Sequence, residues 1–214
     1  MEIKSGSNTL LKDIAYEKIK LGIIEDLYQP GYFLSEKKLV EELEMSKTPI
    51  KSAIDRLESE GFVTVSSKRG IIIKDLSIDR INDIYNLRIA LETFNCKQIY
   101  HRITSNELEE IKTNLNKMAD TVNELNVKQF AQVDHEFHRI ISHIAGNQEI
   151  QHILLNYHDH LYRITLRHLN KEPKRMHKFY EDHIVMYDQL KNHDQECIES
   201  MRKHLDESKQ LLFR

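Results

Sequence analysis

Residues 44–61, EMSKTPIKSAIDRLESEG, form the pattern of a short turn followed by a helix with both ends marked. The Thr48 hydroxyl can accept a backbone N–H of the first turn, which places Pro49 at the first helical position. Gly61 is positioned to end the helix. Apolar residues at helical spacing predict one buried stripe, formed by Ile50, Ala53, Ile54 and Leu57. A helix with a buried back and cations near its N-terminus is shaped to enter a DNA major groove.

The segments around this helix complete a recognisable arrangement. Apolar periodicity predicts two helices before it, the second capped by Ser35, and strand-like runs joined by a turn after it. The expected elements are helix 10–27, helix 36–43, strand 62–65, turn 67–70 and strand 71–73. Together they predict a winged helix-turn-helix domain over residues 1–76.

Charge supports a local DNA surface. The whole chain carries a net charge of −3, so only a local excess of cations could attract DNA. Residues 46–74 hold three more basic than acidic side chains, gathered at the start of the 44–61 helix and in the turn 67–70. A few lysines most often mark a solvated helix face. The cap, the turn spacing and the hairpin together favour DNA binding.

The stretch PGYFLSEKKLVEELEMSKTPIKSAIDRLESEGFV resembles the GntR family of bacterial transcription regulators. The family pattern runs PG-x-x-L-x-E-x-x-L-x-x-x-L-x-x-S-R-T-P-V-R-x-A-L-x-R-L-x-x-E-G-L-V, and the similarity covers nearly the whole first domain. In that family the starts of the second helix and of the recognition helix, with the wing glycine, contact the operator. The resemblance implies the same role here for Lys37, Ser46, Lys47, Thr48, Lys51 and Gly70.

Three of these positions depart from the family. Lys37, Lys47 and Lys51 stand where arginine is usual. Arginine grips guanine O6 and N7 with a planar fork, whereas lysine offers a compact charge. We therefore expect more phosphate contact, weaker guanine discrimination and a marked salt dependence.

The rest of the chain, residues 77–214, predicts an all-helical bundle. The chain has only 6 glycines and 3 prolines, and all 12 histidines lie between residues 101 and 204, which indicates a second domain with a different role. The expected helices are 78–101, 104–124, 127–145, 148–169, 174–192 and 195–212. The predicted fold is mainly α: a winged helix-turn-helix followed by a bundle of about six helices.

Helical register selects four inward polar residues. Asp134 and His138 lie one turn apart beside an apolar stripe, and His183 and His204 lie within the stripes of two later helices. His135 and His143 fall on the back of their helix, where we expect them to be solvated. One buried histidine is most often a hydrogen-bonded core residue. An Asp with three His sharing a register favours a divalent metal, zinc first, with nickel or manganese also suited.

LRIALE (87–92), DHEFH (134–138), AGN (145–147), EDH (181–183) and MRKHL (201–205) resemble the ligand-sensing (FCD) domain of the FadR subfamily. Metal-binding members hold an ion with one Asp and three His, which match Asp134, His138, His183 and His204. In such members the ion and a nearby arginine commonly receive a small carboxylate effector. Our candidate is Arg88, on an inward stripe where an unpaired guanidinium is costly.

Two alternatives accompany the Arg88 assignment. Arg88 could instead form a structural ion pair with Glu92 one turn further on, and we weigh that role equally. His160 and Arg163 are weaker candidates for the pocket wall.

These patterns lead us to expect a homodimeric, DNA-binding repressor that recognises a palindromic operator and responds to a carboxylate. A metal-dependent hydrolytic enzyme with an appended DNA module is one alternative, although no separate general base is evident near the tetrad. A metal-free sensor of acyl ligands is another, and the complete tetrad argues against it. Two cysteines without metal-type spacing, no signal peptide and no run of about 18 apolar residues favour a cytoplasmic protein without a membrane partner.

Overall fold

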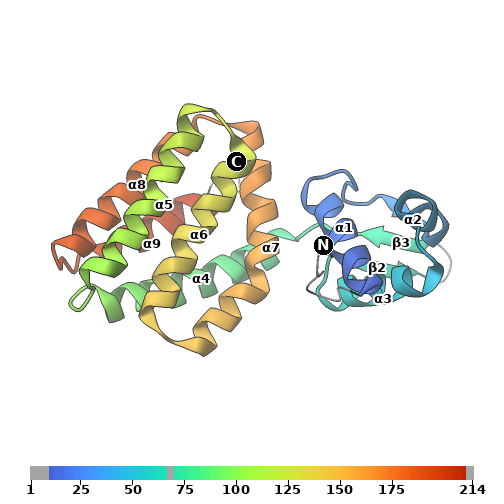
Figure 1. Cartoon of the computed structure of the whole chain (residues 1–214), viewed down its shortest axis with the longest axis horizontal. Helices are drawn as coiled ribbons and strands as arrows, with labels where there is room; N and C mark the ends of the chain where they lie inside the picture. The colour runs from blue at the N-terminus through green and yellow to red at the C-terminus, as the bar shows by residue number, and fades with distance from the viewer. Residues whose placement is uncertain (1–9, 67–69, 211–214) are drawn as a thin grey trace, which may run out of the picture. The chain divides into compact units, whose positions relative to one another are not determined.

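Two units make up the chain, Met1–Leu76 and Ser77–Arg214. The structure, a computed structural model, describes residues 10–66 and 70–210. Figure 1 shows a small α/β unit and a larger unit built from helices alone.

The N-terminal unit is a three-helix fold with a small sheet. Its helices are α1 (Leu11–Ile24), α2 (Glu36–Leu43) and α3 (Lys47–Ser59), and its strands are β1 (Phe33–Leu34), β2 (Val63–Ser66) and β3 (Gly70–Ile73). The strands are antiparallel in the order β1-β3-β2, with Val63 opposite Ile73 and Leu34 opposite Ile71. The α1 helix packs on α3, and the hairpin β2–β3 forms the wing. The predicted winged helix-turn-helix is confirmed; residues 67–69 of the predicted turn 67–70 lie outside the described residues, and Gly70 begins β3.

The start of α3 corrects the sequence prediction. Ser46, not Thr48, is the N-cap residue, and its side chain makes no capping hydrogen bond. Pro49 consequently occupies the third helical position. That position tolerates proline because the first four N–H groups of a helix have no acceptor within it. The predicted stripe is confirmed, since Ile50, Ala53, Ile54 and Leu57 are all buried, now joined by Pro49.

Two other details differ in this unit. The α1 helix ends at Ile24 rather than at residue 27, and the Leu27 side chain is exposed. The two-residue strand β1 was not predicted, because so short a segment shows no periodicity. The Ser35 cap is confirmed: its hydroxyl oxygen accepts the Lys38 N–H at 3.1 Å.

The C-terminal unit consists, over the described residues, of six helices, as predicted. They are α4 (Ile78–Ile99), α5 (Ser105–Asn123), α6 (Val127–Ala145), α7 (Gln148–Lys171), α8 (Arg175–Lys191) and α9 (Cys197–Gln210). The α6 helix packs against α4, α5, α7 and α8, and α4 and α8 both pack against α9. The α6 helix therefore lies among four of the other five described helices of this unit (Figure 1). The predicted extension of the last helix to residue 212 lies outside the described residues.

Side-chain caps fix the helix ends beside the interior. Thr104 and Glu107 form a reciprocal capping box at the start of α5. Gly146 ends α6 in the left-handed conformation, with φ of 80°, and Asn147 then caps α7. Gly146 and Asn147 thus join α6 and α7 directly, and the two helices pack against each other.

The two cysteines lie against each other inside this unit. Cys96 on α4 and Cys197 on α9 are free thiols and buried. A hydrogen bond between the two side chains, with burial, raises the pKa of Cys96 well above its usual range. Among the described helices, none is long and apolar enough to cross a membrane.

Candidate metal centre and nucleic-acid interface

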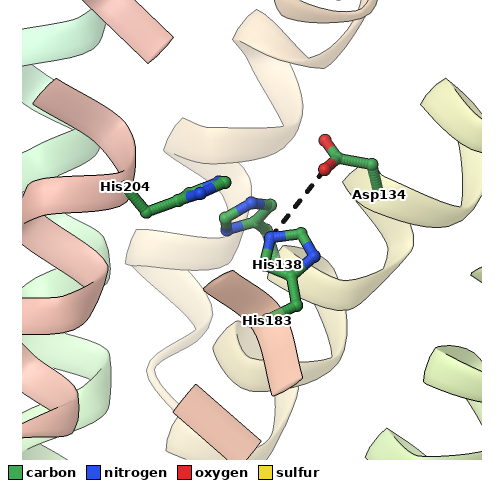
Figure 2. A group of neighbouring side chains, drawn as sticks. All are labelled: Asp134, His138, His183 and His204. Carbon is green, nitrogen blue, oxygen red and sulfur yellow. Dashed lines mark ion pairs between the residues drawn. The ribbon is translucent and has the colours of Figure 1, made fainter. Parts of the chain in front are cut away.

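Four buried side chains from three helices meet in the C-terminal unit. Asp134 and His138 come from α6, His183 from α8 and His204 from α9. Figure 2 shows the four side chains pointing toward one another. Each offers one ligand atom, and these atoms all lie within 4.8 Å of one another. The register chosen from the sequence therefore brings the four residues to one point.

Three buried atoms of this tetrad make no hydrogen bond with the described residues. Oδ1 of Asp134 and Nε2 of both His138 and His183 are buried, with no hydrogen-bond partner among the described residues. The closest approach marked in Figure 2, His183 Nε2 to Asp134 Oδ1, is 3.8 Å, which is too long for a hydrogen bond. Buried polar atoms are normally satisfied, so a convergent set of orphaned N and O atoms fits a divalent ion.

The other ring nitrogen of each histidine is held from outside the tetrad. His138 Nδ1 contacts Glu92 Oε2 at 2.5 Å, and His204 Nδ1 contacts Asp182 Oδ2 at 3.2 Å. A carboxylate that accepts the Nδ1 proton leaves Nε2 with its lone pair free for a metal. His183 Nδ1 lies 3.4 Å from the sulfur of Met118.

These outer carboxylates were missed from the sequence as contributors to the centre. Asp182 directly precedes His183, and Glu92 was considered only as a partner of Arg88. Their contacts with His204 and His138 cross between helices, so helical spacing alone could not reveal them.

Burial favours neutral imidazoles at two ligand histidines and disfavours the ionised form of Asp134. It lowers the pKa of His138 and His183 well below the usual range, which keeps both imidazoles neutral. Burial also raises the pKa of Asp134 to about 6, against the weaker opposing effect of His204 and Arg88. A bound cation would favour the ionised carboxylate, because opposite charge stabilises it.

Arg88 lies beside the tetrad and is buried, with 4% of its surface exposed. Its Nε donates to Glu92 Oε1 at 2.5 Å, so the ion pair that we considered as the alternative role is present. Its Nη2 has no hydrogen-bond partner among the described residues. Glu92 therefore bridges Arg88 and His138, and the guanidinium keeps a donor for a further group. His160 and Arg163, the weaker candidates, are both buried on α7.

His135 corrects one expectation about exposure. It was expected to be solvated, but only 5% of it is exposed, and its Nε2 lies 3.2 Å from Thr165 Oγ1 on α7. The α7 helix covers that side of α6, a contact that the register of a single helix cannot show. His143 is exposed, as expected.

The residues implied in DNA contact lie on the surface of the N-terminal unit. Lys37 is in the first turn of α2, Ser46, Lys47, Thr48 and Lys51 surround the start of α3, and Gly70 begins β3. All six are exposed. Gly70 has a φ of +78°, and a Cβ there would lie 3.2 Å from the Leu34 carbonyl oxygen, so both the backbone conformation and the close approach favour glycine.

Comparison with known families accounts for both units. Residues 83–207 match the FCD domain, and residues 11–73 match the bacterial regulatory proteins of the gntR family. The chain belongs to the GntR family. It is a transcriptional regulator with an N-terminal helix-turn-helix, which implies DNA binding, and a C-terminal FCD domain, which suggests a small-molecule effector.

Curated relatives of this GntR-family chain are regulators. It is 22% identical to the HTH-type transcriptional repressor RspR of Escherichia coli K12 over 90% of this chain and 84% of that protein. It is 28% identical to the Nta operon transcriptional regulator of Aminobacter aminovorans over 58% of each. It is 27% identical to the gluconate operon transcriptional repressor of Bacillus subtilis over 67% of this chain and 58% of that one.

Two solved structures share the fold of this chain. Escherichia coli McbR/YncC superposes with a TM-score of 0.78 at 20% identity, covering 96% of this chain and 98% of that one. A putative transcriptional regulator from Rhodococcus sp. RHA1 gives 0.80 at 16% identity, covering 94% and 97%.

Proposed function

We propose that this GntR-family regulator is a repressor that binds a palindromic operator as a homodimer. A small carboxylate metabolite, bound at a divalent metal site in the C-terminal bundle, controls its affinity for that operator. The observation that carries the proposal is the buried tetrad with its orphaned Nε2 and Oδ1 atoms. The naming of two relatives as repressors supports the sign of regulation.

Asp134, His138, His183 and His204 would hold the ion. Three imidazoles and one carboxylate suit zinc best, and also nickel or manganese. When bound, the ion would supply positive charge that attracts a carboxylate. Arg88 adds the unsatisfied Nη2 donor beside it.

DNA contact is assigned to the exposed ends of α2 and α3 and to the wing. Lys37, Lys47 and Lys51 would pair with phosphates, and the Ser46 and Thr48 N–H groups lie at the helix N-terminus, which favours anions. Gly70 would let the wing backbone approach the duplex closely. A DNA partner of this kind places the protein in the cytoplasm.

The switch requires two states of the dimer with different operator affinity. A two-fold dimer presents two copies of α3 to two half-sites, so its geometry must match their spacing. An effector that binds one dimer geometry more tightly shifts the population toward it. We propose that the effector favours the geometry that does not fit the operator.

The hydrolytic alternative has less support at the tetrad. Its two neighbouring carboxylates, Glu92 and Asp182, are each bonded to a ligand histidine. Neither is placed to act as a separate base on a water molecule.

Metal analysis of the purified full-length protein tests the proposal. We expect one ion per chain in the native protein and its loss in Asp134→Ala and His183→Ala. His143→Ala is the matched control, because His143 is an exposed histidine on α6. A native protein without metal that cannot be loaded with zinc, nickel or manganese would rule out the centre.

Operator binding is tested separately, with duplexes selected from a random library by the wild-type protein. We expect palindromic sites bound by a dimer, as judged by sedimentation of the complex. A single chain on a site without symmetry would contradict the proposal.

A further inference from the structure

A cavity of about 190 Å³ lies between α4, α6 and α7. Of the tetrad, only His138 borders it, together with Arg88 and Glu92 from α4. Exposed residues, among them Arg139 and His152, also line it, so it communicates with solvent. We call this space the α6–α7 cavity.

The space on the metal side of Arg88 is far smaller. A cavity of about 10 Å³ is lined there by Asp134, His204 and Ser208, and shares Arg88 with the α6–α7 cavity. That volume holds about one water molecule. A carboxylate with any carbon chain would need the helices to move before it could enter.

Two side chains that line the α6–α7 cavity carry buried donors without partners. Arg88 Nη2 and Ser142 Oγ make no hydrogen bond among the described residues, and both side chains are more than nine-tenths buried. The only acid in the lining is Glu92, whose oxygens contact Arg88 and His138. An anion is the group that would satisfy a guanidinium and a hydroxyl donor together.

The opposite wall of the cavity, from α7, is partly apolar, because three leucines line it beside Gln151, His152 and His158. The leucines are Leu154, Leu155 and Leu161. A ligand there needs a hydrocarbon part as well as a charge, because an entirely polar molecule would leave these leucines in contact with polar groups.

Volume limits the size of that hydrocarbon part. An apolar cavity of about 150 Å³ is known to accept benzene. A cavity of about 190 Å³ therefore suits an acid with a six- or seven-carbon skeleton. Acetate would leave most of the space unfilled, and only part of a long acyl chain would be enclosed.

We propose that the α6–α7 cavity binds the effector, a monocarboxylic acid with a compact apolar body. The carboxylate pairs with Arg88 and accepts the Ser142 hydroxyl hydrogen, and the body packs on the leucines of α7. This inference rests on the proposed function in taking a carboxylate as effector, and it replaces the placement of that carboxylate on the metal with one in the neighbouring cavity. The acid then lies beside His138 rather than on the metal. Because Glu92 contacts both Arg88 and His138, it connects the acid with the metal.

Calorimetric titration of zinc-loaded full-length protein with benzoate and hexanoate tests this placement. We expect saturable binding of both acids, at least tenfold tighter than that of acetate. Ser142→Leu narrows the α6–α7 cavity and should weaken benzoate binding at least tenfold. Ser208→Leu is the matched control, since Ser208 is a buried helical serine that lines the metal-side cavity; it should change benzoate affinity less than twofold.

A second variant keeps the test valid if Ser142→Leu does not fold. The Leu155 side chain lines the cavity and is 62% exposed, so its truncation leaves the core intact. Leu155→Ala should weaken benzoate binding about threefold to tenfold and shift the preference toward octanoate. Zinc content and thermal unfolding are measured for every variant.

The outcomes separate this inference from the proposed function. If Ser208→Leu weakens benzoate and Ser142→Leu does not, the acid binds on the metal side; the inference fails and the proposed function stands. Unchanged preference in Leu155→Ala likewise overturns the inference. If zinc-loaded protein binds neither benzoate nor hexanoate, the ligand class inferred here is wrong. The proposed function would instead be removed by a protein that binds no metal, or by one that binds a site without symmetry as a single chain.

Discussion

Glu92 shows what a single residue can do that its sequence neighbourhood does not reveal. Helical spacing places it one turn after Arg88, so the sequence already suggests the ion pair between the two residues. Its second bond, to His138 of α6, depends on how α4 packs against α6. The ligands of the tetrad could be selected from register because each lies on an apolar stripe. Glu92, Asp182 and the burial of His135 could not, because each depends on a second helix.

The Glu92 carboxylate should strengthen metal binding through His138. Glu92→Gln leaves the size of the side chain almost unchanged but weakens its acceptance of the Nδ1 proton. We expect zinc affinity to fall by about 10- to 100-fold, as for other second partners of metal-bound histidines. Competition with a chelator measures it. Glu136→Gln on α6, whose carboxylate pairs with exposed Arg139, should leave the affinity unchanged; equal losses in both variants would assign Glu92 a purely structural role.

At the scale of elements, periodicity predicted the long helices well and their ends less well. The α6 helix spans the predicted residues because Gly146 fixes its end. The start of α3 was predicted two residues too late, because Pro49 suits the first helical position. The third position tolerates proline too, and the helix begins after Ser46, which makes no side-chain cap. The strand β1 exists only through its pairing with β3, which no local pattern encodes.

The N-terminal turn of α3 makes a measurable prediction. If Lys47 and Lys51 contact phosphates, Lys47→Ala and Lys51→Ala should each reduce the slope of log affinity against log salt by about 0.9. Both should weaken binding to all duplexes similarly. Lys12→Ala on α1 is the control, an exposed lysine outside α2, α3 and the wing. A change confined to one base position would instead indicate direct base recognition by that lysine.

At the scale of the molecule, the tetrad links three helices of the C-terminal unit. Among the described residues, no other cluster of metal-ligating groups joins these helices. Asp134 and His138 on α6, His183 on α8 and His204 on α9 are separated by up to 70 residues of chain. An ion bound to all of them would stabilise the C-terminal unit and leave the N-terminal unit unaffected. The division into two units predicts that the effect is confined to one of them.

Removing the metal should therefore lower one unfolding transition. At free zinc 100-fold above its dissociation constant, binding contributes about 2.7 kcal/mol. For a unit of this size the chelator should lower the C-terminal midpoint by roughly 5–10 °C. Calorimetry with and without the chelator measures the shift, and Asp134→Ala should abolish it. An equal shift of both transitions would mean that the two units do not unfold independently.

One carboxylate shared between Arg88 and His138 has a further consequence for what the cell could read from this protein. An acid that draws Arg88 away from Glu92 changes how strongly Glu92 holds the His138 proton. Reciprocity then requires that the acid alter metal affinity by the same factor by which the metal alters acid affinity. A promoter controlled in this way would integrate two nutritional signals, the supply of a trace metal and the level of an organic acid.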